Sequence, residues 1–515
     1  MRGFSTPIKL FPLRPSDVGA RNQYSATQCW NAKSGKEGSG FQGYIPDVVP
    51  FPDIVYGAGY LDLTIDWPFP QIFRSDSGIY IGKRDGLYLI SPDGTGGWVA
   101  SLVSSSFLRN VSWPWTFANT PMFPIFASGD LLVYYDYASS SWINWSKTYA
   151  AGDGLVPGAL WSSDWYPPVC ACFFRGQIIV AGSIVATTSP SHSRRVQWSE
   201  IGAVNFLGKS ATPQKNIAGE LFLPTDDKEI VQRVLELAKI VIVYGTFGVY
   251  KLIPMEKPAP GFGCEEIIDT GINSPLAVAG NMRKHLMLDR TGCLYTLTPG
   301  SGWGKSEVEV KPLGYEEFLY PLVSGASFTD KHNMVSIVYN SDTDEFYISN
   351  GKVGYIYDEN GLTQSCKHIT SLITYQDAQV ASTDFANISQ SPVGIYQMTG
   401  DRDFIYATNI LDFGLSSIKL LEGIDIGGSF DDNTSVDVMV AWRNNKRATF
   451  SDTNWKRVSP EGFCAPLVSG VEFIIYVRMS PCQEVELNTL TAKVKVTDKR
   501  FVRGMYTQVG GGEEK

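Results

Sequence analysis

The sequence predicts an all-β protein: a β-propeller of six or seven blades, then a C-terminal antiparallel β-sandwich, with an extended N-terminal arm. Three observations lead to this fold class: proline is concentrated near the N-terminus, a hairpin pattern recurs through the middle, and non-repeating strands follow. They divide the chain into a Pro-rich extended segment (1–70), a propeller (71–385) and a β-sandwich with a short basic tail (386–515).

Proline removes a backbone donor and breaks helices, so we expect the segment 1–70 to be extended and irregular. Its eight prolines are Pro7, Pro12, Pro15, Pro46, Pro50, Pro52, Pro68 and Pro70. Apolar and polar residues alternate over 60–65, which predicts one short strand there.

A hairpin unit recurs from about residue 71 onward. Each copy has a short apolar run, a four-residue turn that contains glycine, and a second run with an apolar residue and tyrosine. Clear copies occur at 79–90, 241–252, 286–297 and 346–357, and weaker ones at 131–135 and 177–181. The segment 226–238 could be an acid-capped helix, but its β-branched residues favour a strand, and we predict a strand.

The spacing of these units indicates propeller blades. The markers Tyr88, Tyr134, Ile179, Tyr250, Tyr295 and Tyr355 are separated by 46, 45, 71, 45 and 60 residues. Four-stranded blades recur about every 40–50 residues, with insertions in loops. Ordinary hairpins in a sandwich or in two stacked barrels remain the alternative.

The repeat stops near residue 386, and strand candidates follow at 417–421, 423–426, 435–442, 471–477 and 491–496. In the third, Val436, Val438, Val440 and Trp442 form one apolar face, as in a sandwich strand.

The composition excludes two protein classes. The 65 aromatic residues exclude a disordered chain, and a net charge of −9 argues against a basic nucleic-acid binder. Eight scattered cysteines without a CxxC pair predict buried free thiols. The N-terminus shows no signal peptide and apolar runs reach five or six residues, so we expect a cytoplasmically made chain without a membrane span.

The motifs that could carry chemistry fail on inspection, and we predict no catalytic, cofactor-binding or metal-ligating residues and no enzyme activity. The histidines at 192, 285, 332 and 368 share no motif, and neither Gly-Lys-Ser segment (208–210, 304–306) has phosphate-loop spacing. The acidic stretch 340–345 lacks the glycine and distal glutamate of a calcium loop, so a polar hairpin turn is the favoured interpretation.

The segment 91–98 resembles the Asp-box turn of sialidase propellers. Ser91, Asp93 and Trp98 match that box, while Thr95 and Gly97 depart from it. A sialidase-like glycosidase is therefore a minor alternative, since it would also need two convergent carboxylates.

Two stretches resemble structural proteins of tailed bacteriophages. The run 194–202, Arg-Arg-Val-Gln-Trp-Ser-Glu-Ile-Gly, is similar to a Trp-Ser-acid-x-Gly run of phage propeller proteins. The run 454–458, Asn-Trp-Lys-Arg-Val, with the strands that follow to Arg503, is similar to the end of tail hub or nozzle proteins of short-tailed phages, also called packaged-DNA stabilisation proteins.

This resemblance implies a structural protein of the virion tail, made in the bacterial cytoplasm and assembled as a homo-oligomer, usually a ring of six copies. Such a ring would join portal and adaptor proteins to a tail needle or fibres, and DNA would cross its lumen during ejection without sequence-specific binding. The sandwich would be the assembly domain. A propeller that binds a receptor or attaches a fibre is the main alternative.

Charge is distributed unevenly along the chain. Residues 1–36 carry +5 and residues 493–515 carry +3, which leaves −17 on the body between them. An acidic body would repel passing DNA, and basic ends could dock on acidic neighbours. Solvated termini are the alternative explanation.

Overall fold

The chain folds into two compact units. The computed structural model describes residues 3–15, 25–35, 40–95, 97–105, 113–121, 123–129, 131–137, 139–145, 167–183, 193–202, 204, 206, 218–225, 228–255, 261–300, 307–324, 334–373, 392–400, 402–431, 433–483 and 485–497. One unit, here the propeller unit, contains Asp47–Lys352 and His368–Gln397. The other, the sandwich unit, contains Met1–Pro46, Val353–Lys367 and Met398–Lys515.

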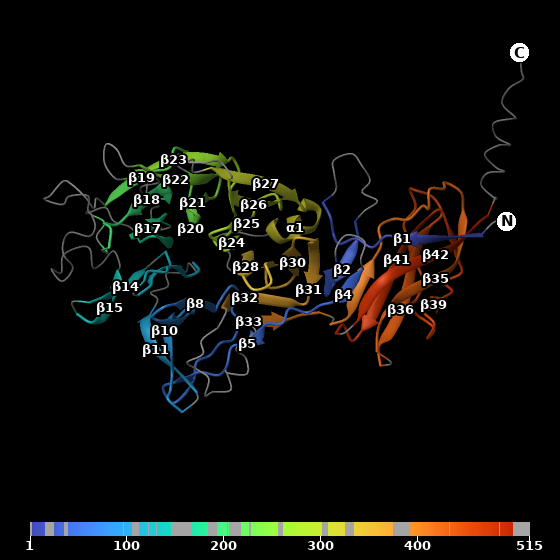
Figure 1. The fold of residues 1–515 in the computed structure, drawn as a ribbon, viewed down its shortest axis with the longest axis horizontal. Helices are drawn as coiled ribbons and strands as arrows, with labels where there is room; N and C mark the ends of the chain where they lie inside the picture. The colour runs from blue at the N-terminus through green and yellow to red at the C-terminus, as the bar shows by residue number, and fades with distance from the viewer. Residues whose placement is uncertain are drawn as a thin grey trace, which may run out of the picture. The chain divides into compact units, whose positions relative to one another are not determined.

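Six small sheets form a six-blade β-propeller arrangement in the propeller unit (Figure 1). The first blade contains β8 (Gln71–Ser75), β9 (Gly78–Gly82), β10 (Gly86–Pro92) and β11 (Trp98–Ser105), with β6 (Val55–Tyr56) and β7 (Gly59–Tyr60) at its edge. The second contains β12 (Thr116–Ala118), β13 (Ile125–Ala127), β14 (Leu132–Asp136) and β15 (Ser141–Trp145). The third contains β16 (Cys170–Phe174), β17 (Gln177–Ala181), β18 (Arg195–Trp198) and β19 (Gly219–Phe222).

The other three blades complete the arrangement. The fourth contains β20 (Val231–Leu237), β21 (Ile240–Gly245), β22 (Val249–Met255) and β23 (Gly261–Ile268). The fifth contains β24 (Val278–Asn281), β25 (Lys284–Leu288), β26 (Leu294–Pro299) and β27 (Val308–Gly314). The sixth is a sheet of β32 (Lys367–Ile373), β33 (Val393–Met398) and β5 (Val49–Pro50).

A further hairpin, β28 (Ser336–Asn340) with β29 (Glu345–Ser349), lies between the fifth and sixth blades. On one side the Ile337 amide donates to the Leu276 carbonyl at 2.8 Å. On the other, Ser349 Oγ hydrogen-bonds His368 Nδ1 at 2.8 Å. The hairpin therefore links two blades through hydrogen bonds.

The repeated sequence pattern forms the blade hairpins, which confirms the predicted fold class. The copies at 79–90, 241–252 and 286–297 are the pairs β9–β10, β21–β22 and β25–β26. The fourth clear copy, 346–357, is not a blade hairpin, because β29 belongs to the propeller unit and β30 (Gly354–Asp358) to the sandwich unit. Each glycine turn is closed by backbone bonds, such as the Gly245 amide donating to the Gly248 carbonyl at 2.8 Å. The segment 226–238 contains strand β20, as predicted.

Buried side chains fill the space between neighbouring blades. A cluster between the third and fourth blades includes Phe174, Trp198 and Val243. A polar bridge joins the fourth blade to the fifth: the Tyr244 hydroxyl and His285 Nδ1 lie 2.7 Å apart, and His285 Nε2 lies 3.0 Å from the Glu236 carbonyl. Burial lowers the pKa of His285 to about 4, so the ring is neutral at neutral pH.

The sandwich unit contains two largely antiparallel sets of strands (Figure 1). One sheet contains β3 (Ala32–Ser34), β4 (Phe41–Gly43), β42 (Glu486–Val496), β35 (Lys419–Ser429) and β39 (Phe463–Cys464), with β1 (Gly3–Ile8) on β42 and β40 (Val468–Gly470) on β35. The other set contains β30 (Gly354–Asp358), β31 (Gly361–Ser365), β2 (Gln28–Trp30), β34 (Phe404–Ala407), β41 (Glu472–Ser480), β36 (Ser435–Arg443), β37 (Ser451–Asp452) and β38 (Lys456–Arg457).

Buried and half-buried side chains alternate along β36, and the buried face includes the valines that the sequence predicted. On β36, Val436, Val438 and Val440 are buried, while Asp437 and Met439 between them are half-buried. The predicted fourth member of this face, Trp442, is half-buried. This period of two is typical of a strand with one face against a core.

Asn31 joins distant segments of the sandwich unit. Its Oδ1 accepts from the Cys366 amide at 2.9 Å, and its Nδ2 donates to the Asp403 carbonyl at 3.0 Å. Its own carbonyl accepts from the Tyr44 amide at 2.8 Å and from Cys482 Sγ at 3.1 Å. The residue is fully buried in a left-handed conformation (φ 51°), which asparagine tolerates better than most residues.

One local expectation was wrong, and one helix was not predicted. The strand expected over 60–65 is absent, because the pairing of β7 ends at Tyr60 and residues 61–65 lie outside any strand. A helix, α1 (Glu316–Val323), follows the fifth blade and includes Pro321, a residue that argues against a helix in the sequence. The N-terminal segment is extended, as predicted, and its short strands belong to both units.

We predict that Asn31→Ala lowers the free energy of unfolding by roughly 3 kcal/mol. The change leaves buried backbone groups without partners and puts alanine in a left-handed conformation. Asn31→Gly, which tolerates that conformation, should lose about 1 kcal/mol less. Chemical denaturation followed by tryptophan fluorescence measures both, with exposed Asn488→Ala as the control. Equal stability of the Ala variant and the parent would contradict this role.

The neutral His285 makes stability pH-dependent. Because its folded pKa is about 4, below the unfolded value of about 6.5, its contribution is complete above pH 6.5 and falls as the pH drops toward 4. We expect a loss of about 2 kcal/mol from this residue between pH 7 and pH 5. His285→Phe should be less stable at pH 7 but show a shallower pH dependence in the same denaturation assay. Identical slopes for variant and parent would show that His285 does not contribute.

Candidate functional site

The first phage-like run, 194–202, forms hydrogen bonds and packing contacts that stabilise the third blade. Trp198 is 6% exposed and packs edge-on against Phe262, with ring centroids 5.1 Å apart. Ser199 Oγ accepts from the Ile178 amide at 2.9 Å, and the Gly202 amide donates to the Gly176 carbonyl at 2.8 Å. The Trp-Ser-x-x-Gly pattern therefore fastens the chain after β18 to the β16–β17 turn.

The two arginines of the same run are also used inside the blade. Arg194 donates from Nη1 to the carbonyls of Leu223 and Thr225, at 3.1 and 2.8 Å. Arg195 forms an ion pair with Glu220 on the neighbouring strand. These contacts give the run a structural role in the blade.

The second phage-like run, 454–458, builds a charged cluster on the sandwich unit. Arg478 lies over the ring of Trp455, 4.6 Å from its centroid, and donates from Nη2 to Asp437 Oδ2 at 3.1 Å. Arg457 approaches the other oxygen of Asp437 at 3.5 Å, and its side chain is 61% exposed. We call Trp455, Arg478, Asp437 and Arg457 the Trp455 cluster.

The cluster has the properties of a contact surface for an anionic partner. Two guanidinium groups share one carboxylate, so the cluster carries a net positive charge. Arginine presents planar donors that match carboxylates in two places at once, and it stacks on aromatic rings. The exposed Arg457 can reach an acidic group outside the chain. The neighbouring Lys456 is bound to the carbonyls of Ala465 and Pro466 at 3.3 and 3.1 Å.

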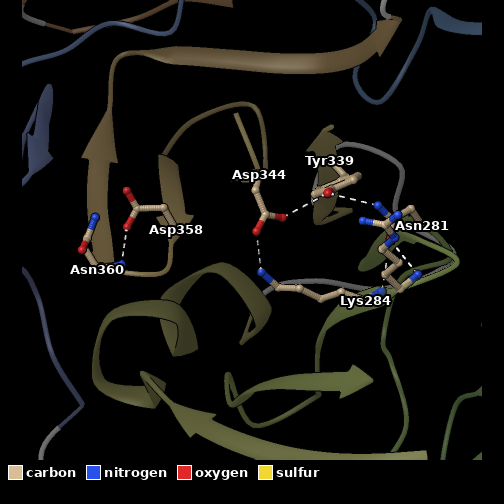
Figure 2. A network of polar contacts seen from close by, with 7 residues as sticks. Asn281, Lys284, Tyr339, Asp344, Asp358 and Asn360 are labelled. Carbon is tan, nitrogen blue, oxygen red and sulfur yellow. Dashed lines mark hydrogen bonds and ion pairs between the residues drawn. The ribbon is translucent and has the colours of Figure 1, made fainter. Parts of the chain in front are cut away.

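The acidic stretch 340–345 is a polar hairpin turn between β28 and β29, as favoured from the sequence. Asp344 accepts from Tyr339 Oη at 3.0 Å and pairs with Lys284 Nζ at 3.3 Å, and Asn281 Nδ2 donates to Tyr339 Oη at 3.1 Å (Figure 2). The network clamps the β24–β25 turn to the β28–β29 turn. The side chain of Glu345 is also bound, by Tyr347 Oη at 2.9 Å.

Burial by the fold and the neighbouring Asp344 carboxylate raise the pKa of Tyr339 to about 12, so the phenol keeps its proton and donates to that carboxylate. The acidic side chains Asp344 and Glu345 of this stretch are therefore bound by groups of the same chain. Figure 2 also shows the turn after β30, in the sandwich unit, where Asp358 accepts from the Asn360 amide. The Gly361 amide donates to the same carboxylate oxygen of Asp358.

The segment that resembles an Asp-box is a turn at the end of the first blade. Asp93 Oδ1 accepts from the amides of Thr95 and Gly97 at 2.7 and 2.8 Å, and Trp98 is buried. Asp289 accepts from the amides of Thr291 and Cys293 in the same way, at 2.8 and 2.9 Å. These hydrogen bonds stabilise the two turns.

The thiols and two of the histidines lie in the interior. All eight cysteines are free; Cys264 is half-buried and the others are buried. His285 and His368 are buried, whereas His192 and His332 lie outside the described residues, as do the Gly-Lys-Ser segments 208–210 and 304–306. Over the described ranges, no three His, Cys, Asp or Glu side chains are grouped to hold a metal ion. No helix in the described part of the chain is long and apolar enough to cross a membrane.

The sequence alone could not predict which residues form the Trp455 cluster. The run 454–458 carries the resemblance, but Asp437 and Arg478 come from β36 and β41, and strand register brings them together. The signal in the sequence is an aromatic residue next to two basic residues in a turn-rich segment.

Comparison with known proteins leaves the family open. No protein-family model matches the chain, and no curated protein matches it. Among solved structures, it is similar to the extracellular domain of a hybrid two-component system from B. thetaiotaomicron, at 13% sequence identity with a TM-score of 0.29. The match covers 70% of this chain and 46% of that one, so this chain spans less than half of that protein's length.

We predict that Ser199→Ala lowers the free energy of unfolding by about 1–3 kcal/mol. The Ile178 amide would lose its buried acceptor, and desolvated donors are costly to leave unpaired. Exposed Ser139→Ala is the control, and chemical denaturation is the measurement. A Ser199→Ala protein with unchanged stability but impaired assembly would contradict the structural role of this run.

Proposed function

We propose that the chain is a structural protein of a bacteriophage virion, the tail hub or nozzle of a short-tailed phage. Copies would associate into a ring, usually of six, between the portal and adaptor proteins and the distal tail. The ring would form part of the channel for DNA ejection. The role requires assembled surfaces and needs no catalytic centre.

The Trp455 cluster carries this proposal. It is built on the run that resembles the end of tail hub proteins, and it presents an exposed guanidinium beside an aromatic ring. Arginine and tryptophan are enriched at protein interfaces. The acidic body of the chain, at −17, offers carboxylates for such a surface on a neighbouring copy.

The uneven charge also supports a conduit. An acidic body repels DNA and does not trap it. At the C-terminal end, Lys493 pairs with Asp425 at 2.9 Å and Lys495 pairs with Glu422 at 3.3 Å, so both are matched within the sandwich unit.

One observation favours the alternative, a propeller that binds a receptor or attaches a fibre. On the first blade, Val99 pairs with Val55 and Val55 pairs with Tyr60, so the three lie in one row across β11, β6 and β7. They are 38%, 40% and 70% exposed. Clustered exposed apolar residues often mark interaction sites.

Native mass spectrometry of the purified full-length protein separates these functions. A tail hub gives one discrete closed species, expected at six copies, and electron microscopy of that species shows rings. A monomer or a trimer would overturn the hub proposal. Binding of that monomer or trimer to host-cell surfaces, lost in Tyr60→Ala, would establish the receptor-binding alternative.

We predict that Arg457→Glu abolishes ring formation without lowering the melting temperature measurably. The side chain is 61% exposed and its ion pair is worth less than about 1 kcal/mol, so the fold does not depend on it. Arg447→Glu, an equal charge change at an exposed site of the same unit, is the control and should assemble normally. Normal rings from the Arg457 variant would remove the Trp455 cluster from the interface.

A further inference from the structure

In the part of the chain that the structure describes, β1, the first strand of the sandwich unit, has one edge without a partner strand. Among the described residues, β1 pairs with β42 and with no second strand, in a register that sets Gly3 opposite Lys495 and Ile8 opposite Leu490. Gly3, Phe4, Ser5 and Pro7 are exposed, and Thr6 and Ile8 are half-buried. An edge of this kind presents backbone N–H and C=O groups to any incoming strand.

The edge has few of the usual protections against strand addition. It carries no charged residue between Arg2 and Lys9, and Pro7 is its one blocked donor. Phe4, Thr6 and Ile8 share one side of the strand, because side chains alternate. Phe4 is 36% exposed on that side. A partner strand would extend this side and cover it.

Charge argues against pairing of β1 with a second β1. An antiparallel pair centred on Ser5 and Thr6 places Arg2 opposite Lys9 at both ends. Like charges directly opposite each other are destabilising. The edge therefore fits a partner strand that is uncharged along its length and acidic beyond the Arg2 end.

The C-terminal tail, which lies outside the described residues, has this composition. Met505–Val509 is an uncharged run that includes the strand-forming residues Tyr506, Thr507 and Val509. Three glycines and then Glu513 and Glu514 follow it. Laid antiparallel with Val509 opposite Phe4, the run places Met505 opposite Ile8 and Thr507 opposite Thr6. Apolar residues then face apolar residues, and polar residues face polar residues.

The ends of this register are also compatible. Gly504 falls opposite Lys9, so no like charges meet there. The acidic pair Glu513 and Glu514 comes within reach of Arg2. We propose that residues 505–509 of a second copy add as an antiparallel strand to the β1 edge, so that each copy donates its tail to the next.

The path of the chain favours a second copy over the same chain. Because Lys495 pairs with Gly3, a chain's own tail leaves the sheet at the Gly3 end of β1. An antiparallel strand must enter at the Ile8 end, about 17 Å away at about 3.3 Å per residue. The return would lay the charged residues Asp498, Lys499, Arg500 and Arg503 along β1. Donation to a neighbour avoids this return, and one edge and one tail per copy give a head-to-tail contact that can close into a ring.

Disulfide trapping between two differently substituted proteins tests the register. Phe4→Cys protein is mixed with Val509→Cys protein and oxidised by air with copper phenanthroline. We expect a covalent dimer whose digest contains the peptide pair linked through positions 4 and 509. Ile8→Cys with Met505→Cys should link equally well. The mismatched control, Phe4→Cys with Met505→Cys, should give less than a tenth of that product.

Absence of the linked dimer would overturn the inference. So would linkage confined to single chains that carry both Phe4→Cys and Val509→Cys. A peptide of residues 504–515 adds a second measurement, because it should bind a protein shortened after Thr497, and its Thr507→Pro form should bind at least tenfold more weakly. Equal binding by the two peptides would also count against strand addition.

The inference rests on the proposed ring for the identity of its partner, and the two can fail separately. Closed rings without the linked dimer would refute the strand exchange and leave the tail hub standing. Linked dimers that never close into rings would support the exchange and refute the hub.

Discussion

The buried side chain of Asn31 is the contact on which the sandwich unit depends. Its amide holds backbone groups of Cys366 and Asp403, and its carbonyl holds Tyr44 and Cys482, so one residue ties together segments hundreds of positions apart. The Cys366 amide and the Asp403 carbonyl would lose their bonds to this side chain in Asn31→Ala, whereas the bonds of Tyr44 and Cys482 to the backbone carbonyl do not depend on the side chain. Both ends of the chain can belong to one unit because this junction fixes the N-terminal segment against β31 and β34.

In the propeller unit, by contrast, most strand pairs are formed by segments that are close in the sequence. Each of its first five blades is a run of consecutive strands, and local hairpins supply the pairing except between β6 and β11 of the first blade, which pair in parallel. Neutral buried groups such as His285 then bridge blade to blade. The sandwich unit, by contrast, brings together distant segments of the chain and carries the Trp455 cluster. Both proposed assembly contacts, the Trp455 cluster and the β1 edge, belong to the sandwich unit.

The sequence predicted the parts of the fold that form by local pairing, and it did not predict the parts that depend on long-range pairing. The blade hairpins and the β36 face were predicted because glycine turns and alternating valines act within a few residues. The pairing of β2 with β31 and β34 was not, because long-range pairing leaves no local periodicity. Helix α1 was missed since Pro321 argues against it. The run 454–458 was singled out for its resemblance, but its partners Asp437 and Arg478 required the register of β36. The tail hub function stays a prediction.

The central claim is that three separated chain segments form one cooperative body around Asn31. Hydrogen–deuterium exchange of the full-length protein, resolved by peptide, tests it most directly. We expect the amides of β2, β31, β34 and β41 to exchange with one common protection, and Asn31→Ala to lower the protection of all four strands together while leaving β21 and β22 of the propeller unit unchanged. Rapid exchange of β2 in the parent protein, with β41 still protected, would contradict it.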